Sequence, residues 1–481
     1  MSLTGLAATG ICSMLGASIY VVPFMIQRNV PGIGPYVLPA FLMAAVPAIL
    51  AAFAYAILAS AMPRAGGSYV YASRGLHPYL GFIASFSQWF GLSIAIGVVS
   101  YVIIPFLRDI ALALHWSALA ASLDIGSIRV LLALAILWFF VWVNIRGIAL
   151  YERTLIPLMV MMFVLGAIVI LRGLTSALEE FVVALAAEGR SVPETISQFD
   201  PWVFLSASAV LFSSFIGFDS IAQAGGEARN PGRNLPLAIA LAVGTVGTFY
   251  MLFTIAVYHA VPWQFVAGEA MQSDVTAPGL MSRLLSPAWT VCIVAGAAVA
   301  LTNDLPAMLL SVSRLMFAWA EDGIFPSRVT KVHAKFKTPA TAILLSGVMA
   351  SVGILGSHFA GDFFLGIDIL VTSMLVNFLV MCLSLIALPS RNPAIAHEIK
   401  IIRSRRTQLV LSWTGVIILS GFLVVHIIKD IMTPASGWYF HSTAVWILVM
   451  IVGSVIYFRE LGRLRRQGTD IKKLFSTLPP E

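Results

Sequence analysis

Residues 211–236 read LFSSFIGFDSIAQAGGEARNPGRNLP, and the architecture of the chain can be predicted from this segment outward. It is an apolar run that is interrupted by Ser213, Ser214, Gly217 and the carboxylate of Asp219. A helix that crosses lipid needs roughly 20 mostly apolar residues, so small polar residues and a charge at mid-depth are costly there. The stretch therefore predicts a broken membrane helix whose exposed backbone binds a small solute.

The composition of the 481-residue chain is that of a polytopic membrane protein, with 59% hydrophobic and only 11% charged residues. The first apolar stretch begins at Leu3 without a basic segment or a cleavage pattern, so we expect the first span to remain in the mature protein. The cysteines Cys12, Cys292 and Cys382 are far apart, which predicts neither disulfides nor a metal site. No basic patch with interleaved aromatic residues is present, which excludes nucleic acid as a partner.

Twelve apolar windows of about 20 residues predict twelve membrane-spanning helices and an all-α integral membrane fold. Because twelve is even, both termini share one side of the membrane. About three quarters of the 29 Lys and Arg residues fall in segments on that side, so the positive-inside rule predicts a multi-pass inner-membrane protein with both termini in the cytoplasm. The windows cover residues 3–26, 36–62, 79–107, 128–145, 154–172, 203–226, 236–261, 287–318, 339–357, 364–389, 408–428 and 442–458.

The first and sixth spans share the same kind of interruption. Gly16, Ala17 and Ser18 lie at mid-depth in the first span, and the breaks in residues 211–236 lie at the matching depth five spans later. Because five is odd, a second copy of a five-span unit enters the bilayer from the opposite side, which predicts an inverted repeat around a central binding site. The predicted organisation is a first repeat at 1–174, an extracytoplasmic linker at 175–202, a second repeat at 203–390, spans eleven and twelve at 391–458, and a basic cytoplasmic tail at 459–481 that contacts membrane lipids.

Five sequence patterns occur in order along most of the chain: LGASIY at 15–20, PRAGGSY at 63–69, VNIRG at 143–147, FIGFD with the following NPGRNLP at 215–236, and SR with AEDGIFP at 313–326. Together they resemble the amino acid/polyamine/organocation transporter superfamily. The resemblance implies a five-plus-five inverted-repeat transporter fold with broken helices one and six and two additional C-terminal helices. It also implies a permease that carries out secondary transport of amino acids or related amines.

A broken helix offers binding groups without charged side chains. It leaves unpaired N–H groups where its second half begins and unpaired C=O groups where its first half ends, and these suit a carboxylate and an ammonium group respectively. We assign the N–H groups of Ala17 and Ser18 to the substrate carboxylate and the C=O groups of Met14, Ser213 and Ile216 to its amine. The alternative is that the small residues only allow close helix packing. The full candidate set is Met14, Gly16, Ala17, Ser18, Ile19, Phe212, Ser213, Phe215, Ile216 and Gly217.

Two positions depart from the family pattern. The family usually has glycine where this chain has Ser18, so a side chain lies near the expected carboxylate site, where its hydroxyl either donates to the ligand or makes the pocket smaller. Many relatives carry a bulky aromatic residue where this chain has Ser213, so Phe212 or Phe215 would have to close the outer gate.

Coupling to an ion is predicted from the carboxylates inside the membrane. Some family members place a lysine in the fifth span in place of a sodium ion, but this chain has no lysine before Lys331. A carboxyl group within a membrane can carry a proton, so Asp304 is a candidate carrier, with lining a vestibule or hydrogen bonding within its helix as the alternative. Asp219 is expected to cap the broken helix. We expect proton coupling or exchange first, and sodium coupling through the oxygen atoms of Thr302 and Asn303 second.

Arg64, Glu227 and Arg314 all fall on the predicted cytoplasmic side, where opposite charges are expected to pair and close an inner gate. No cofactor is expected. The sequence has no GxGxxG, Walker, nucleophile-elbow or HExxH pattern, so it predicts a transporter rather than an enzyme. A non-transporting membrane nutrient receptor on the same scaffold is the alternative function, and the oligomeric state stays open.

Overall fold

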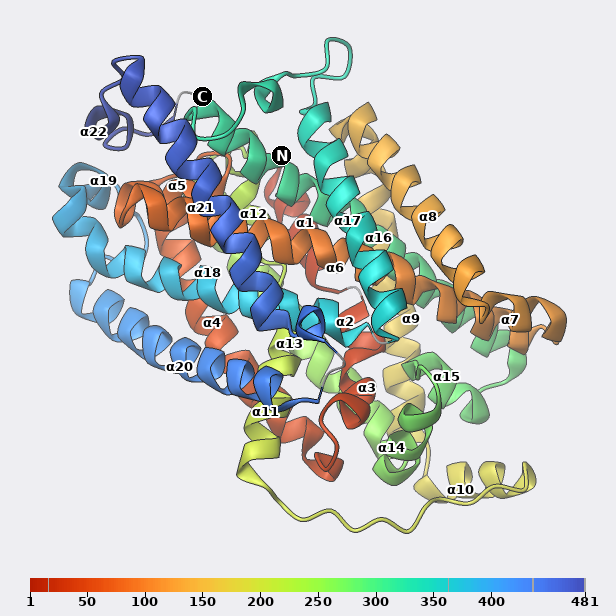
Figure 1. Cartoon of the computed structure of the whole chain (residues 1–481). Helices are drawn as coiled ribbons and strands as arrows, with labels where there is room; N and C mark the ends of the chain where they lie inside the picture. Colours follow the sequence, from red (N-terminus) through yellow and green to blue (C-terminus); the bar gives the residue numbers. More distant parts are fainter. Residues whose placement is uncertain (16, 362, 435–436, 480–481) are drawn as a thin grey trace.

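The structure, a computed structural model, describes residues 1–15, 17–361, 363–434 and 437–479, without the side chains of residues 17–18, 148–154 and 287. In this part of the chain every regular element is a helix, and one isolated backbone bridge joins Ala65 to Ala224 (Figure 1). The expected all-helical membrane fold is confirmed at this level.

Ten helices in the described part of the chain are long and apolar enough to cross a membrane. They match ten of the twelve predicted spans, because runs of Leu, Val, Ile, Ala and Phe leave these segments no polar face. The other two predicted spans, the first and the sixth, are each divided into short helices. The ten are α4 (Val37–Ala61), α6 (Pro78–Ala113), α8 (Gly126–Arg146), α9 (Ile148–Thr175), α13 (Pro231–Ala260), α16 (Pro287–Glu321), α17 (Ala340–Ala360), α18 (Phe364–Arg391), α20 (Arg405–Met432) and α21 (Ser442–Arg466).

The first span consists of α1 (Leu3–Met14), α2 (Ala17–Tyr20) and α3 (Val22–Asn29). Ser2 caps the start of α1 by accepting a hydrogen bond of 3.1 Å from the backbone N–H of Gly5. Pro23 lies in the first turn of α3. Because proline has no N–H to continue a preceding helix, it favours a new helix start at this point.

The sixth span consists of α11 (Pro201–Leu211), the short 3-10 helix η2 (Phe212–Phe215) and α12 (Asp219–Gln223). Asp200 caps α11 by accepting hydrogen bonds from the N–H groups of Trp202 and Val203. Gly217 lies between η2 and α12 with φ of 131°, a conformation that glycine adopts without steric cost. The predicted interruption of this span is therefore present in its backbone.

The helix α6 is the centre of the packing. It contacts α16, α17 and α18 along its length, and α1 packs against α13 and α16. In Figure 1, α6 runs across the middle of the molecule. By contrast, α8, α9, α20 and α21 lie at the periphery and expose large apolar side chains such as Leu131, Val164 and Ile417, as a lipid-facing helix requires.

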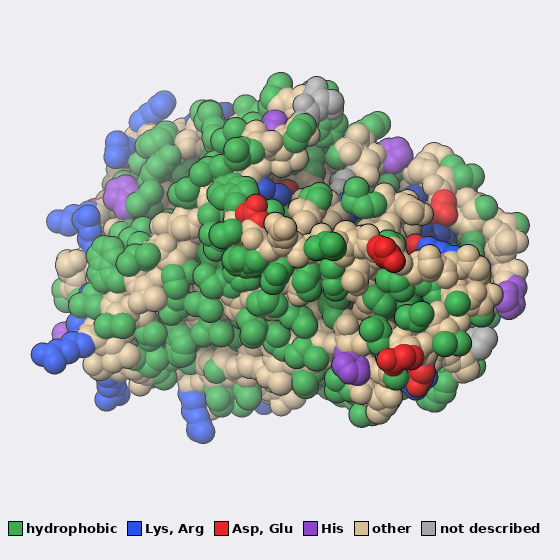
Figure 2. Space-filling model, turned by 90° about the horizontal axis from the view of Figure 1, so that it is seen from below, with side chains coloured by type: hydrophobic (Ala, Val, Ile, Leu, Met, Phe, Trp, Pro, Cys, Tyr) green, Lys and Arg blue, Asp and Glu red, His purple; other side chains and the backbone are tan. Residues whose placement is uncertain are grey.

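Both chain ends lie on the same face of the bundle, which we call the terminal face (Figure 1). The backbone N–H of Arg229 donates to the carbonyl of Met1 over 2.9 Å, and Arg64 Nε donates to the carbonyl of Pro479 over 3.0 Å. Seen from below, the molecule has projecting Lys and Arg side chains at one end, acidic side chains in the other half and a broad hydrophobic surface between them (Figure 2). The linker helix α10 (Leu178–Ala187) lies far from the terminal face.

Candidate functional site

A cavity of about 50 Å³ lies between the two interrupted spans. The helices α6 and α16 and the start of α18 complete its wall. Most of the wall is apolar, because α6 and α18 contribute only Leu, Ala, Val, Phe and Ile to it. The lining residues are Ser13, Val21, Val22, Leu92, Ala95, Val98, Val99, Val102, Ser213, Ile216, Asp304, Met308, Phe363, Ile367 and Leu370.

Three polar side chains line this cavity. Asp304 on α16 is only 4% exposed, and among the described residues its Oδ1 atom has no hydrogen-bond partner. The hydroxyl of Ser213 is likewise buried without a partner in the described part of the chain. Ser13 Oγ lies 2.8 Å from Ser220 Oγ, so these two hydroxyls satisfy each other. The cavity therefore offers one carboxyl group and one hydroxyl that are free to bind a ligand.

The two interruptions contact each other directly. A Cβ atom at Gly217 would lie 2.3 Å from the carbonyl oxygen of Ser13 and 2.8 Å from the backbone nitrogen of Met14, so only glycine fits there. The carbonyl of Met14, one of the groups assigned to the substrate amine, accepts a hydrogen bond from the hydroxyl of Tyr250 on α13. The break in the first span is thus held in place by the break in the sixth and by α13.

Asp219 lies at the start of α12, and its carboxylate is fully satisfied by hydrogen bonds. One oxygen accepts from the backbone N–H of Gly217 over 3.1 Å, and the other accepts from Nε2 of Gln88 on α6. Asp219 does not line the cavity. Its carboxylate binds the backbone of the interruption at Gly217, and no side-chain hydrogen bond caps the start of α12.

Behind Asp219, a buried chain of polar side chains crosses the bundle. Ser68 Oγ donates to Gln88 Oε1 over 2.5 Å and accepts from Gln223 Nε2 over 2.7 Å. Tyr55 OH lies 2.9 Å from the same hydroxyl, and Asn377 Nδ2 donates to Tyr55 over 2.6 Å. This chain of hydrogen bonds was not predicted from the sequence. Its signal is the occurrence of Gln and Asn inside otherwise apolar spans, where an unpaired amide is costly.

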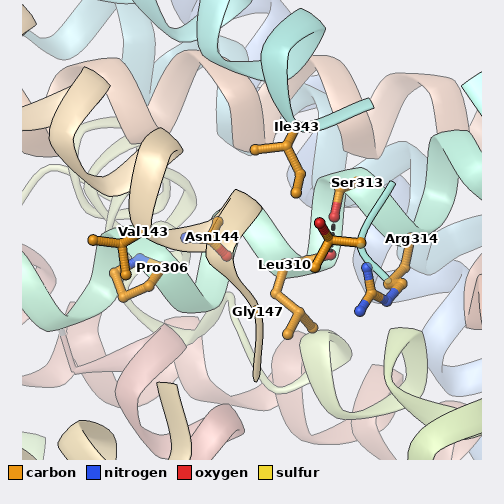
Figure 3. A pocket seen from close by; sticks show the side chains of 9 residues that line it. Val143, Asn144, Gly147, Pro306, Leu310, Ser313, Arg314 and Ile343 are labelled. Atoms are coloured by element: carbon orange, nitrogen blue, oxygen red, sulfur yellow. Dashed lines mark hydrogen bonds between the residues drawn. The ribbon is translucent and has the colours of Figure 1, made fainter. Parts of the chain in front are cut away.

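Residues expected at the inner gate lie on the terminal face. Arg314 donates to Glu227 from Nη2 over 2.6 Å and from Nε over 2.9 Å, so this pair forms as expected. Arg64 instead donates to the carbonyl of Pro479 in the C-terminal segment. A small pocket beside Arg314 brings the 143–147 and 313–314 motifs together, with Asn144, Gly147 and Arg314 in its wall (Figure 3).

A second ion pair on this face was not predicted. Arg74, on α5 (Gly67–Gly75), donates to Asp322 over 2.9 Å, and both side chains are almost completely buried. Tyr69 OH also donates to Asp322. Burial acts to lower the pKa of Arg74, but its interactions with Asp322 and Tyr69 outweigh burial and raise that pKa above its ordinary value. This pair joins α5 to the end of α16.

Several candidate residues do not line the cavity. Ile19 is buried elsewhere, Phe212 packs against Phe378, and Phe215 packs against Phe41. Gly16 lies outside the described residues, and the side chains of residues 17 and 18 do as well. Of the ten proposed substrate-binding residues, the cavity wall contains Ser213 and Ile216.

The oxygen-bearing neighbours of Asp304 are engaged within the protein. Thr302 Oγ1 donates to the carbonyl of Val299 over 2.7 Å, and Asn303 Nδ2 donates to Cys12 Sγ over 3.2 Å. Neither residue lines the cavity. A search of the described residues finds no cluster of three or more His, Cys, Asp or Glu side chains that could hold a metal ion.

Comparison with known proteins shows extended similarity. A protein family described as amino acid permease matches residues 1–463. The chain is 28% identical to the branched-chain amino acid permease of Bacillus subtilis, over 55% of this chain and 53% of that protein. It is 30% identical to the vacuolar cationic amino acid transporter 2 of Arabidopsis thaliana, over 34% of this chain and 25% of that protein. It is 28% identical to the methylthioribose transporter of Bacillus subtilis, over 44% of each chain. The chain therefore spans about half the length, or less, of these curated relatives.

Proposed function

Because the chain belongs to the amino acid permease family of the amino acid/polyamine/organocation superfamily, a transporter family rather than an enzyme family, we propose that it is a secondary active transporter of amino acids or related amines. It works by alternating access in the inner membrane, on a five-plus-five inverted-repeat fold with two additional C-terminal helices. The observation that carries this proposal is the cavity between the two interrupted spans, with the unpartnered carboxyl group of Asp304 in its wall.

The substrate binds where the two interruptions meet. Its carboxylate is bound by the N–H groups of Ala17 and Ser18, and its amine by carbonyl groups at Met14, Ser213 and Ile216. Support comes from Ser213 and Ile216, which line the cavity, and from the contact of Gly217 with Ser13. Small-molecule sites usually measure about 300–1,000 Å³, so the cavity has to widen when an amino acid enters.

Access alternates between the two faces. The Arg314–Glu227 and Arg74–Asp322 pairs close the terminal face, whereas pockets of about 520 and 350 Å³ lie at the far ends of the helices. We assign the terminal face to the cytoplasm because about three quarters of the Lys and Arg residues fall in segments on the side of the two chain ends. On this assignment, both ion pairs must separate when the transporter opens inward.

Transport is coupled to protons or to exchange, and Asp304 is the coupling residue. Its carboxyl group faces the cavity, whereas Thr302 and Asn303 do not line it. This difference favours a proton over sodium. Sodium-coupled symport remains the second candidate mechanism.

Reconstitution tests the proposed function. Purified protein in liposomes is supplied with a panel of labelled amino acids and amines, and uptake is compared with that of protein-free liposomes. We expect at least one compound to enter by a saturable route. If a compound of the panel binds but no compound enters the liposomes, transport is contradicted and the nutrient receptor is supported instead.

A further inference from the structure

Asp304 has an unusual charge environment for an ionisable group. Among the described residues that line the cavity, it is the one with an ionisable side chain, and no Lys, Arg or His faces it. On the short helices packed against α16, Cys12 of α1 is bound to Asn303, and Asp219 of α12 is satisfied by Gln88 and Gly217. Arg74 and Tyr69 of α5 are both bound to Asp322 at the end of α16. On α18, Asp368 is paired with Lys429 over 3.2 Å. These neighbours supply Asp304 with no compensating positive charge.

A buried carboxylate without a partner is too costly to persist in a membrane interior. The charge has to be removed by a proton or balanced by a cation. Because the rest of the wall is apolar, a cation that enters here should carry an apolar body, which packs against side chains such as Leu92, Val98 and Met308.

We propose that Asp304 is the counter-ion for the protonated amine of the substrate, which the carbonyl groups at the interruptions also bind, and that it takes up this amine in exchange for its own proton. This inference rests on the proposed transport function and adds to it the substrate class and the direction of coupling. The substrate class is a compound with a protonated nitrogen on an apolar body.

The exchange balances in both charge and protons. When the ammonium group enters, the O–H bond of Asp304 breaks, its proton passes to the solution on the entry side, and the carboxylate pairs with the ammonium group. On the other side the ammonium group leaves and a proton returns to the carboxylate. One carboxyl group holds either the proton or the ammonium group, so the two move in opposite directions. Symport through Asp304 is thereby excluded.

Three related compounds test the substrate class: leucine, isoamylamine, which lacks the carboxylate, and isocaproate, which lacks the amine. We expect leucine and isoamylamine to compete for a common site and isocaproate to have no effect. In the Asp304→Asn protein, affinity for both amines should fall at least tenfold. Glu179→Gln, which makes the same carboxylate-to-amide change at an exposed position on α10, should leave both affinities unchanged.

Proton movement tests the exchange. Liposomes that contain the protein and a pH-sensitive dye receive substrate from outside, and protein-free liposomes correct for diffusion of neutral amine. Exchange predicts that the lumen becomes alkaline as substrate enters, in a ratio of about one proton to one substrate molecule. The measurement on the wild-type protein alone decides the direction of proton movement. It therefore tests the exchange even where the Asp304→Asn protein fails to fold. Acidification during uptake, or uptake without proton movement, would overturn the exchange and leave the permease function intact, whereas absence of uptake would instead contradict the proposed function.

Discussion

Gly217 lies so close to Ser13 that a Cβ atom at position 217 would be 2.3 Å from the Ser13 carbonyl oxygen. This contact joins the interruption of the sixth span to that of the first. The two halves of the candidate site are therefore positioned by each other, and a change in one must displace the other.

Replacing Gly217 with alanine should reduce uptake more than tenfold. The added methyl group has to push the two breaks apart, and the backbone at φ of 131° adds strain of about 1–3 kcal/mol for a residue other than glycine. Gly189→Ala is the matched control, because Gly189 also has a positive φ of 71° but nothing within 4 Å. Equal uptake by the two variants in liposomes would show that the contact with Ser13 is not needed.

Asp219→Ala should lower thermal stability without changing the pH dependence of uptake. The substitution leaves the amide of Gln88 and the N–H of Gly217 without their acceptor, which costs about 1–3 kcal/mol for each buried group. Unfolding is followed by differential scanning fluorimetry in detergent. If the pH profile of uptake flattens in this variant, Asp219 takes part in proton coupling and its role is not purely structural.

Asp322→Asn should be among the most destabilising single substitutions on the terminal face. It leaves the buried guanidinium of Arg74 without its charge partner, and breaking a buried pair costs about 3–5 kcal/mol. Glu180→Gln breaks the exposed pair with Arg172 and should cost only about 0–1 kcal/mol. Comparable melting temperatures for the two variants would show that the Arg74 pair contributes little.

Glu227→Gln should shift the protein toward the state that is open at the terminal face. The substitution removes the charge that holds Arg314, so the gate closes less tightly. The readout is the rate at which a thiol reagent labels Ser313→Cys, measured in a background with Cys292→Ser because Cys292 is exposed. We expect faster labelling than in the same background with Glu227 intact, and an unchanged rate would argue against a gating role for this pair.

The sequence alone predicted the helical spans and the position of both breaks, because Gly, Ser, Pro and Asp inside apolar runs are costly and easily seen. It did not predict which side chains line the cavity. Leu92, Val98 and Val99 belong to a helix that is apolar all round, so no periodic pattern distinguishes the face toward the cavity. Phe212 or Phe215 was expected to close the outer gate, and the 3-10 turn that contains them places both side chains in the core.

Some pairs between residues far apart in the sequence could be predicted, and others could not. Glu227 and Arg314 follow from opposite charges on one side of the membrane, one in the segment after the sixth span and the other near the end of the eighth. The Arg74–Asp322 pair and the hydrogen bond from Gln88 to Asp219 join elements far apart in sequence, and their partners depend on the tilt of α6 and α16. The role of Asp304 was left open between carrier and vestibule residue, because its orientation toward the cavity depends on how α16 is rotated in the bundle.

Ser213→Trp tests whether substrate binds in the cavity between the two interrupted spans. The indole ring should occupy the cavity of about 50 Å³ beside Asp304 and abolish equilibrium binding of the transported compound, and expression with a cooperative melting transition shows that the variant still folds. Ser390→Trp, at an exposed position near the end of α18, controls for the added ring. The predicted result is that Ser213→Trp loses binding and Ser390→Trp keeps it. An unchanged affinity in Ser213→Trp would contradict binding in this cavity and place the site elsewhere.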